Sequence, residues 1–398
     1  MIHVLHIALS IVSIIVSTTY GYQAVVIAPV VDTYGEAIQE HDMPVCGGSV
    51  NPFIACKRGH QLLYNEIVDI IEETDNHVKI SIPTIFYLAN NTICNDYWAD
   101  KKYFLPLKII PHTEKIPAPF SKELDIPHSN CVVLIDPYYD KKSHRFFSVG
   151  TRFVMAKKQN KRKTIPVWLF NNNAKTFYIA HIPHKKCLFQ THKNIQDRID
   201  DFVSVLRHWA HIEHGYIPYV WGGCSYIYPA HAHTIHEKKE KQNNTTTSYY
   251  TIHAYNPPIK TGFDCSSLIC RAAQISNIPY FFKNTTTLSK LLKEVGYNEP
   301  IQNGDLIWVP WHVMIVSDVQ NNMLIEARGY NHGYGKIHEV PLHTVFKNIY
   351  TYNDLQEHLK AKKIIIRLDK NGNEKDIYKQ YKILAMKTVF KPTNNQSA

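Results

Sequence analysis

The sequence predicts an α+β protein in which a helix bearing a cysteine packs on an antiparallel sheet, preceded by one or two small β-barrels. Two observations indicate this fold class. Short runs rich in Val and Ile, separated by Gly, Pro and Asn, fill the first half of the chain and are typical of strands. Residues 195–212 and 265–276 instead repeat their apolar residues at three- and four-residue intervals, which is the period of a helix with one buried face.

Composition places the chain among folded globular proteins. Of its 398 residues 44% are hydrophobic and 12% aromatic, and its length corresponds to about two to four domains. The formal charge is +10, but the lysines are scattered and form no basic stripe interleaved with aromatics, so no nucleic-acid partner is expected. An anionic cell envelope is a partner that fits this charge.

Residues 1–21 resemble a signal peptide, because residues 4–16 are apolar or small and Thr19-Tyr20-Gly21 supplies small residues where a signal peptidase cleaves. No Lys or Arg precedes the apolar run, so an uncleaved anchor is the alternative. No later segment approaches transmembrane length, so we expect an exported mature chain without an integral membrane segment, in the periplasm, the cell envelope or the extracellular space.

The strand runs predict two β units. The first covers residues 22–110, and a proline-marked join at 116–119 leads to the second, at 111–192. The predicted strands are residues 24–31, 78–82, 131–135, 152–156 and 165–169.

The remaining chain divides into a third domain at 193–350, opened by the helix at 195–212, and a C-terminal extension at 351–398 without an assigned function. The third domain contains an insertion at 224–262 that is rich in His, Lys, Asn and Thr and is predicted to be an exposed loop. We interpret its histidines as solvated residues and predict no metal site; they are His231, His233, His236 and His253.

Eight cysteines are present, and if one is catalytic the other seven cannot all pair with one another. Cys46 and Cys56 are near enough to close a small loop, and Cys94 could reach Cys131, but spacing leaves the connectivity open. No CxxC pair occurs, so a structural zinc site is not expected.

The stretch Thr261-Gly262-Phe263-Asp264-Cys265-Ser266 leads from a glycine into the predicted helix. Asp264 is the natural N-cap, and Cys265 then lies in the first turn, where free N–H groups and the helix dipole favour the thiolate. We interpret Cys265 as a nucleophile; the alternative is a packed cysteine.

Two predicted strands, at 306–309 and 312–316, back this helix, and the second begins with His312, which we interpret as the general base. Glu326 interrupts an apolar strand at 323–327 and is predicted to orient the histidine, although a solvent-facing carboxylate is the alternative. His332 and His338 are other candidates for the orienting role.

Upstream, the segment 216–223 ends in paired glycines that permit close approach of the backbone to a ligand. Its Tyr219 is a candidate donor to the oxyanion formed during acyl transfer. The alternative is an aromatic residue at the rim of the site.

Together, the ordered motifs Tyr219-x-Trp221-Gly222-Gly223, Asp264-Cys265-Ser266, Gly304-Asp305-Leu306 and His312-Val313 resemble the NlpC-type cell-wall peptidases, papain-like cysteine hydrolases of bacterial peptidoglycan, over about residues 195–345. The β regions are similar to the bacterial SH3-like modules that precede this domain in multidomain members.

The resemblance implies that Cys265 is the nucleophile, His312 the base and Tyr219 an oxyanion contributor. It further implies that Asp264 and Ser266 hold the free amino end of the substrate, and that an SH3-like wall limits the cleft to short stem peptides. Two departures stand out. The third catalytic position is commonly histidine but is Glu326 here, and the insertion at 224–262 is longer than the family's link, which makes it a candidate cap of the cleft.

The sequence thus predicts an exported cysteine endopeptidase that cuts peptidoglycan-derived peptides, between γ-D-glutamate and a diamino acid, through an acyl-enzyme. It requires no cofactor and is expected to act as a monomer. The competing hypotheses are a wall-binding protein with weakened activity and a Cys/His amidase that cuts between sugar and peptide.

Overall fold

The computed structural model describes residues 21–35, 58–89, 91–120, 130–157, 163–172, 174–190, 193–213, 215–227, 235–238, 247–250, 261–329 and 334–390. Residues 1–20 of the predicted signal peptide lie outside these ranges, as do Cys46 and Cys56. Most of the insertion at 224–262 and His332 also lie outside the described residues.

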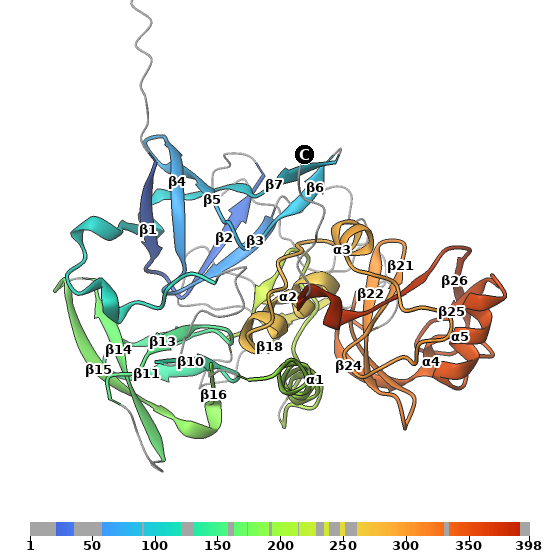
Figure 1. Cartoon of the computed structure of the whole chain (residues 1–398). Helices are drawn as coiled ribbons and strands as arrows, with labels where there is room; N and C mark the ends of the chain where they lie inside the picture. The colour runs from blue at the N-terminus through green and yellow to red at the C-terminus, as the bar shows by residue number, and fades with distance from the viewer. Residues whose placement is uncertain are drawn as a thin grey trace, which may run out of the picture.

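The first β region forms an antiparallel sheet in the order β3–β2–β8–β5–β4–β1–β9 (Figure 1). Its strands are β1 (Tyr22–Val26), β2 (Val30–Tyr34), β3 (Arg58–Leu63), β4 (Ile67–Glu73), β5 (His77–Ser81), β8 (Asp96–Asp100) and β9 (Phe104–Pro106). The hairpin β6 (Tyr87–Ala89) and β7 (Thr92–Cys94) lies beside it. The predicted strand at 24–31 is two strands, because Pro29 lies between them and has no N–H to donate to a ladder.

The second β region contains three small antiparallel groups that share a core with the first. The strands are β10 (Cys131–Leu134), β13 (Arg152–Val154), β16 (Cys187–Phe189), β11 (Tyr138–Asp140), β12 (Arg145–Phe147), β14 (Thr164–Asn171) and β15 (Thr176–Pro183). Tyr64 of the first region packs edge-on against Phe147 of the second, with ring centroids 4.9 Å apart. Cys94 and Cys131 are free thiols, so they do not form the disulfide considered from their spacing.

The third region confirms the predicted α+β class. Its sheet is antiparallel in the order β24–β23–β22–β21–β27, and the helices α1 and α2 pack on it. The bounds are α1 (Ile195–Ala210), α2 (Cys265–Ile275), α3 (Thr285–Leu291), β21 (Leu306–Val309), β22 (His312–Asp318), β23 (Met323–Arg328) and β24 (Lys336–Pro341). The strands β17 (Cys224–Ser225) and β20 (Gly262–Phe263) pair next to α2, and β18 (Ile235–Lys238) pairs with β19 (Thr247–Tyr250) within the insertion.

Helix α2 is buried on all sides rather than on the single face that the sequence predicted. Every residue of α2 is buried, because the helix lies between the sheet of the third region and the first β region (Figure 1). Arg271 faces the first region, where its guanidinium donates to Glu66 Oε1 at 2.7 Å and to the carbonyl of Gln61 at 3.1 Å. The polar side of α2, outside its predicted apolar face, is therefore buried with its hydrogen-bonding groups paired.

The C-terminal extension adds to the same sheet. After α4 (Leu342–Val345) and α5 (Tyr352–Lys360), the strands β25 (Ile365–Leu368) and β26 (Glu374–Tyr378) form a hairpin, and β27 (Lys382–Leu384) pairs with β21. The carbonyl and N–H groups of β21 are thus paired on both sides. A short 3-10 helix at Met386–Phe390 follows.

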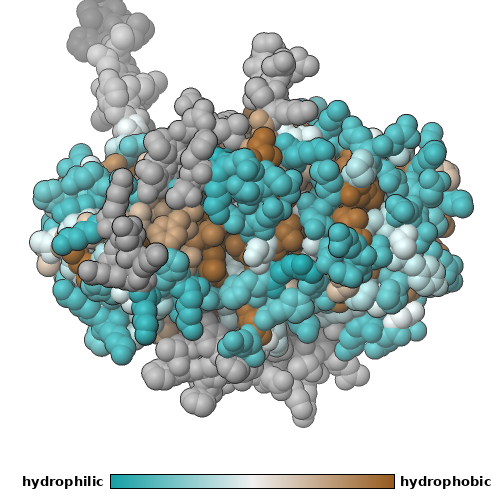
Figure 2. All heavy atoms as spheres, turned by 60° about the horizontal axis from the view of Figure 1, so that its bottom comes forward, coloured by the Kyte–Doolittle hydropathy of each residue, from teal (hydrophilic) through white to brown (hydrophobic). Residues whose placement is uncertain are grey.

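On the face shown in Figure 2, hydrophilic residues predominate and apolar residues appear in separate small groups. Such a distribution is typical of a surface in contact with water. Within the part of the chain that the structure describes, no helix combines the length and the apolar character needed to cross a membrane.

The role of β27 can be tested with two isoleucines of the extension. Ile383 on β27 is fully buried, whereas Ile377 on β26 is 61% exposed. Truncating a buried isoleucine to alanine leaves a cavity, so we expect Ile383→Ala to lower the free energy of unfolding by about 2–5 kcal/mol and Ile377→Ala by less than about 1 kcal/mol. Thermal and urea denaturation would measure both, and equal losses would contradict the placement of β27 in the core.

Candidate active site

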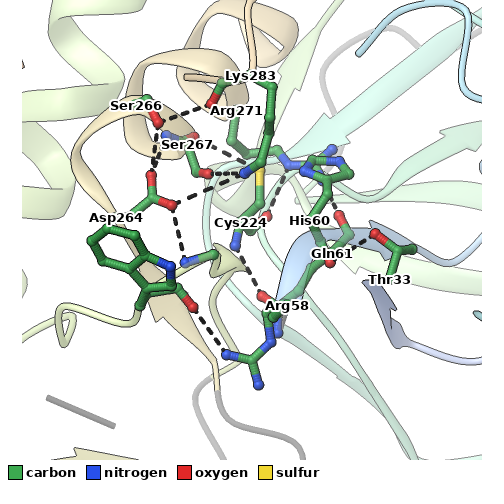
Figure 3. Close-up of polar contacts among 12 residues, drawn as sticks. Thr33, Arg58, His60, Gln61, Cys224, Asp264, Ser266, Ser267, Arg271 and Lys283 are labelled. Atoms are coloured by element: carbon green, nitrogen blue, oxygen red, sulfur yellow. Dashed lines mark hydrogen bonds and ion pairs between the residues drawn. The ribbon is translucent and has the colours of Figure 1, made fainter. Parts of the chain in front are cut away.

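Asp264 caps the helix that begins with Cys265. Its Oδ1 accepts a hydrogen bond from the Ser267 N–H at 2.7 Å, which satisfies one of the free donors of the first turn, as the sequence predicted. Its Oδ2 accepts from the Gly222 N–H at 3.0 Å (Figure 3). One carboxylate therefore fixes both the helix start and the Gly-Gly turn.

The sulfur of Cys265 lies next to the strand that begins with His312. Helix α2 packs on β22 and β23, and the backbone N–H of Val313, the residue after His312, acts on the sulfur as a hydrogen-bond donor. The N–H of Ser266 does the same from the helix start. The predicted nucleophile and the predicted base thus lie at the contact between α2 and β22.

Burial raises the pKa of the Cys265 thiol to about 12, and the neighbouring charge of Asp264 acts in the same direction. The N–H groups of Val313 and Ser266 and the cation of Arg328 lower it, but they do not offset burial. The helix start does favour the thiolate, as the sequence predicted, but burial has the larger effect and keeps the pKa of Cys265 raised.

His312 is oriented by Glu326. The ring Nε2 lies 2.6 Å from Glu326 Oε2, and both side chains are buried. An ionised carboxylate can only accept a hydrogen bond, so the proton of the neutral imidazole is on Nε2. The lone pair of Nδ1 is then available to accept a proton, which is what a general base requires.

Burial lowers the pKa of His312 to about 3, and the cations of Arg328 and Arg367 reinforce that shift. The hydrogen bond and the charge of Glu326 oppose it without cancelling it. His312 is consequently a neutral imidazole at neutral pH.

Glu326 lies at the centre of a buried polar network. Its Oε1 accepts from Arg367 Nη2 at 2.5 Å and from His338 Nε2 at 3.0 Å. Although burial disfavours its charged form, Arg367 and the bonds from His312 and His338 hold the pKa of Glu326 well below its ordinary value. Glu326 thus contacts the histidine, as predicted, and is not the solvent-facing residue of the alternative interpretation. His338, the other candidate, lies in the same network.

Tyr219 lies close to the start of the helix. It forms a parallel bridge with Phe263, and its backbone N–H donates to the carbonyl of Gly335 at 2.9 Å. Burial and the neighbouring Cys265 and Asp264 raise the pKa of the Tyr219 phenol well above its ordinary value. The phenol therefore stays a neutral hydrogen-bond donor.

Ser266 is engaged within the chain. Its Oγ lies 3.0 Å from Asp264 Oδ1 and 2.9 Å from the carbonyl oxygen of Lys283 (Figure 3). The side chain of Lys283 adds two contacts: its Nζ donates to Ser267 Oγ at 2.7 Å and lies 4.0 Å from Asp264 Oδ2. These contacts occupy much of the acceptor capacity of the carboxylate. Binding of a substrate amino group by Asp264 and Ser266 stays a prediction.

Three residues of this region were not predicted from the sequence: Arg367, Arg328 and Lys283. Arg367 interrupts the apolar run Ile364-Ile365-Ile366-Arg367-Leu368, just as Glu326 interrupts an apolar strand. A buried charge in each strand needs a partner of opposite sign, so this pattern could have predicted an ion pair between the two residues. No such signal marks Lys283, which follows Phe281 and Phe282 in a loop.

The protonation state of Cys265 can be tested by alkylation. Because its pKa is about 12, the thiolate fraction should rise about tenfold per pH unit through the neutral and mildly alkaline range. We expect the rate of carbamidomethylation of Cys265 by iodoacetamide, followed by peptide mass spectrometry, to increase from pH 6 to pH 9 without a plateau. A plateau that begins below pH 7 would instead indicate a preformed thiolate–imidazolium pair.

No family profile matches the sequence, and a search of curated proteins finds no match. Among solved structures, the chain is similar to an NlpC/P60 family protein from Bacillus cereus, with 14% identity and a TM-score of 0.48 over 83% of this chain and 96% of that one.

The chain is also similar to NlpC2 from Trichomonas vaginalis, with 12% identity and a TM-score of 0.31 over 81% of this chain and 94% of that one. A third similar structure is the peptidoglycan hydrolase RipB from Mycobacterium tuberculosis, with 18% identity and a TM-score of 0.23 over 37% of this chain and 60% of that one.

Proposed function

We propose that this chain is an exported cysteine peptidase that hydrolyses an amide or isopeptide bond in peptidoglycan stem peptides. One observation carries the proposal. Cys265, at the capped start of α2, lies beside the N–H of the residue that follows His312, and Glu326 holds His312 at 2.6 Å. A thiol, a neutral imidazole and an orienting carboxylate are the groups that acyl transfer through a thioester requires.

In the first step, His312 Nδ1 accepts the thiol proton as Cys265 Sγ attacks the carbonyl carbon of the scissile bond. The thiol is protonated at rest, so proton transfer accompanies attack and does not precede it. Glu326, already ionised, stabilises the imidazolium that forms. The oxyanion is stabilised by the neutral phenol of Tyr219 together with backbone N–H groups at the start of α2.

In the second step, the imidazolium protonates the leaving amine, the C–N bond breaks, and a thioester to Cys265 remains. His312 then deprotonates a water molecule, which attacks the thioester carbonyl and releases the carboxylic acid. The thiol regains its proton from His312, so the cycle consumes only water and needs no cofactor.

The finer substrate assignment rests on the ordered motifs. It includes cleavage between γ-D-glutamate and a diamino acid, recognition of the substrate's amino end by Asp264 and Ser266, and SH3-like β regions that limit the cleft to short stem peptides. Export follows from the predicted signal peptide at 1–21, and the insertion at 224–262 is the candidate cap. The chain is proposed to act as a monomer.

The nucleophile can be tested against a matched cysteine. Cys265 and Cys187 are both 8% exposed free thiols, but Cys187 lies on β16 in the second β region. We expect Cys265→Ala to lower the release of cleaved muropeptides, measured by mass spectrometry, by at least about a thousandfold, whereas Cys187→Ala keeps it. If the Cys265→Ala protein still released cleaved muropeptides at the wild-type rate, the proposal would be contradicted.

Product masses separate the competing functions. A peptidase leaves peptides split within the stem, whereas an amidase releases the whole stem peptide from the sugar. A wall-binding protein without activity would release neither, and a cysteine-directed activity probe would then fail to label Cys265 in the folded chain.

A further inference from the structure

The C-terminal extension contributes a buried arginine to the network around Glu326. Arg367 lies on β25 and is 1% exposed. Its Nη2 donates to Glu326 Oε1 at 2.5 Å, and its Nη1 contacts Met314 Sδ at 3.2 Å. Met314 belongs to β22, the strand that begins with His312, so Arg367 contacts the strand of the proposed base as well as its carboxylate.

Stability alone does not account for this arginine. Removing a guanidinium from water is costly, and a buried ion pair is often no more stabilising than apolar side chains of similar volume. Within the part of the chain that the structure describes, Arg367 Nε is buried without a hydrogen-bond partner. The site therefore keeps an incompletely satisfied cation, and its charge is directed at Glu326.

The two carboxylate oxygens of Glu326 have different hydrogen-bond partners. Oε1 accepts from Arg367 and His338, and Oε2 lies against His312. A cation on Oε1 favours the ionised carboxylate, and an ionised carboxylate at Oε2 requires the His312 proton to be on Nε2. Arg367 thus acts on the base through one intervening residue.

We propose that Arg367 is a positioning residue of the catalytic histidine, which keeps Glu326 ionised and His312 a neutral base with its lone pair on Nδ1. The inference rests on the proposed function, because that function assigns His312 the role of base. It gives the C-terminal extension a part in the chemistry of the third domain.

The charged and titratable groups that face His312 come from four elements. Those that act on its charge are Glu326 and Arg328 of β23 and Arg367 of β25. Two others lie next to them: His338 of β24, which is bonded to Glu326, and Cys265 of α2, which accepts from the N–H of the neighbouring Val313. Arg328 is itself paired with Asp376 of β26 at 3.2 Å. Two cations and one anion thus surround the imidazole, and loss of Arg367 would leave one of each.

The sign of the expected pH effect follows from this arrangement. Besides its contact with Glu326, the cation of Arg367 also disfavours the imidazolium through its own charge. Glu326 keeps its bonds from His312 and His338 when Arg367 is removed, so the removal should raise the pKa of His312 from about 3 toward the ordinary value. A base with a higher pKa is protonated over more of the acidic range. The acidic limb of kcat/KM, where activity falls as the base gains a proton, should therefore move upward in pH.

The experiment compares Arg367→Gln, which removes the charge, with Arg367→Lys, which keeps it. Over pH 3 to pH 8, we expect the acidic limb of kcat/KM of the wild-type chain to lie below pH 5, and that of Arg367→Gln to lie at least one pH unit higher. Arg367→Lys should stay within half a unit of the wild-type profile. Arg152→Gln is the matched control, because Arg152 is also buried but is bonded to Gln190 in the second β region, and it should leave the profile unchanged.

A titration independent of turnover separates this inference from the proposed function. The histidines are labelled with ¹⁵N, and the His312 signals are identified by comparison with His312→Gln. Followed from pH 8 to pH 3, the wild-type imidazole should stay neutral down to pH 5, and the titration midpoint of Arg367→Gln should lie at least one unit above that of the wild type. If the wild-type chain cleaves nothing but this shift occurs, the proposed function fails and the effect of Arg367 on His312 stands.

Three outcomes would overturn the inference. They are an unchanged His312 titration in folded Arg367→Gln, a shift of equal size in Arg152→Gln, and a wild-type His312 that titrates near pH 6.5. The last is measured on the wild-type chain alone, so it decides the matter even if the Arg367→Gln protein does not fold.

Discussion

The carboxylate of Asp264 is the constraint on which the candidate site depends. It caps α2 through the Ser267 N–H and holds the Gly222 N–H with its other oxygen, so two segments about forty residues apart meet at one side chain. The cap fixes where the helix begins and therefore places Cys265 in its first turn. The second bond brings the turn after Tyr219 to the same point. Without this carboxylate, the proposed nucleophile and the proposed oxyanion donor would have no common anchor.

Burial then decides the charge states of the reacting groups. The thiol of Cys265 and the imidazole of His312 are both removed from water, and each is held in its neutral form. Glu326, although equally buried, stays ionised because Arg367, His312 and His338 donate to it. The negative charge of the site therefore lies on the Glu326 carboxylate and not on the Cys265 sulfur, and the proposed mechanism accordingly couples attack to proton transfer.

The regions before and after the third domain both support this arrangement. The first β region covers the polar side of α2, where Arg271 bonds Glu66 and the carbonyl of Gln61. The C-terminal extension pairs β27 with β21 and places Arg367 against Glu326. Helix α2 is therefore enclosed by parts of the chain that precede and follow the third domain, which explains why all of its residues are buried.

Local sequence determined the elements that carry the chemistry. The apolar period defined α2 to within one residue of its end, Asp264 was recognisable as its cap, and the alternating strands placed His312 at the start of β22 and Glu326 within β23. These features depend on neighbouring residues, whose preferences are readable from spacing. The tertiary structure alone decided that Arg367 meets Glu326, that Lys283 lies beside Asp264, and that Cys265 is a thiol with a raised pKa. Those outcomes depend on burial and on charges brought together from distant parts of the chain, and the free energy of a charge in a protein is set by its surroundings in space.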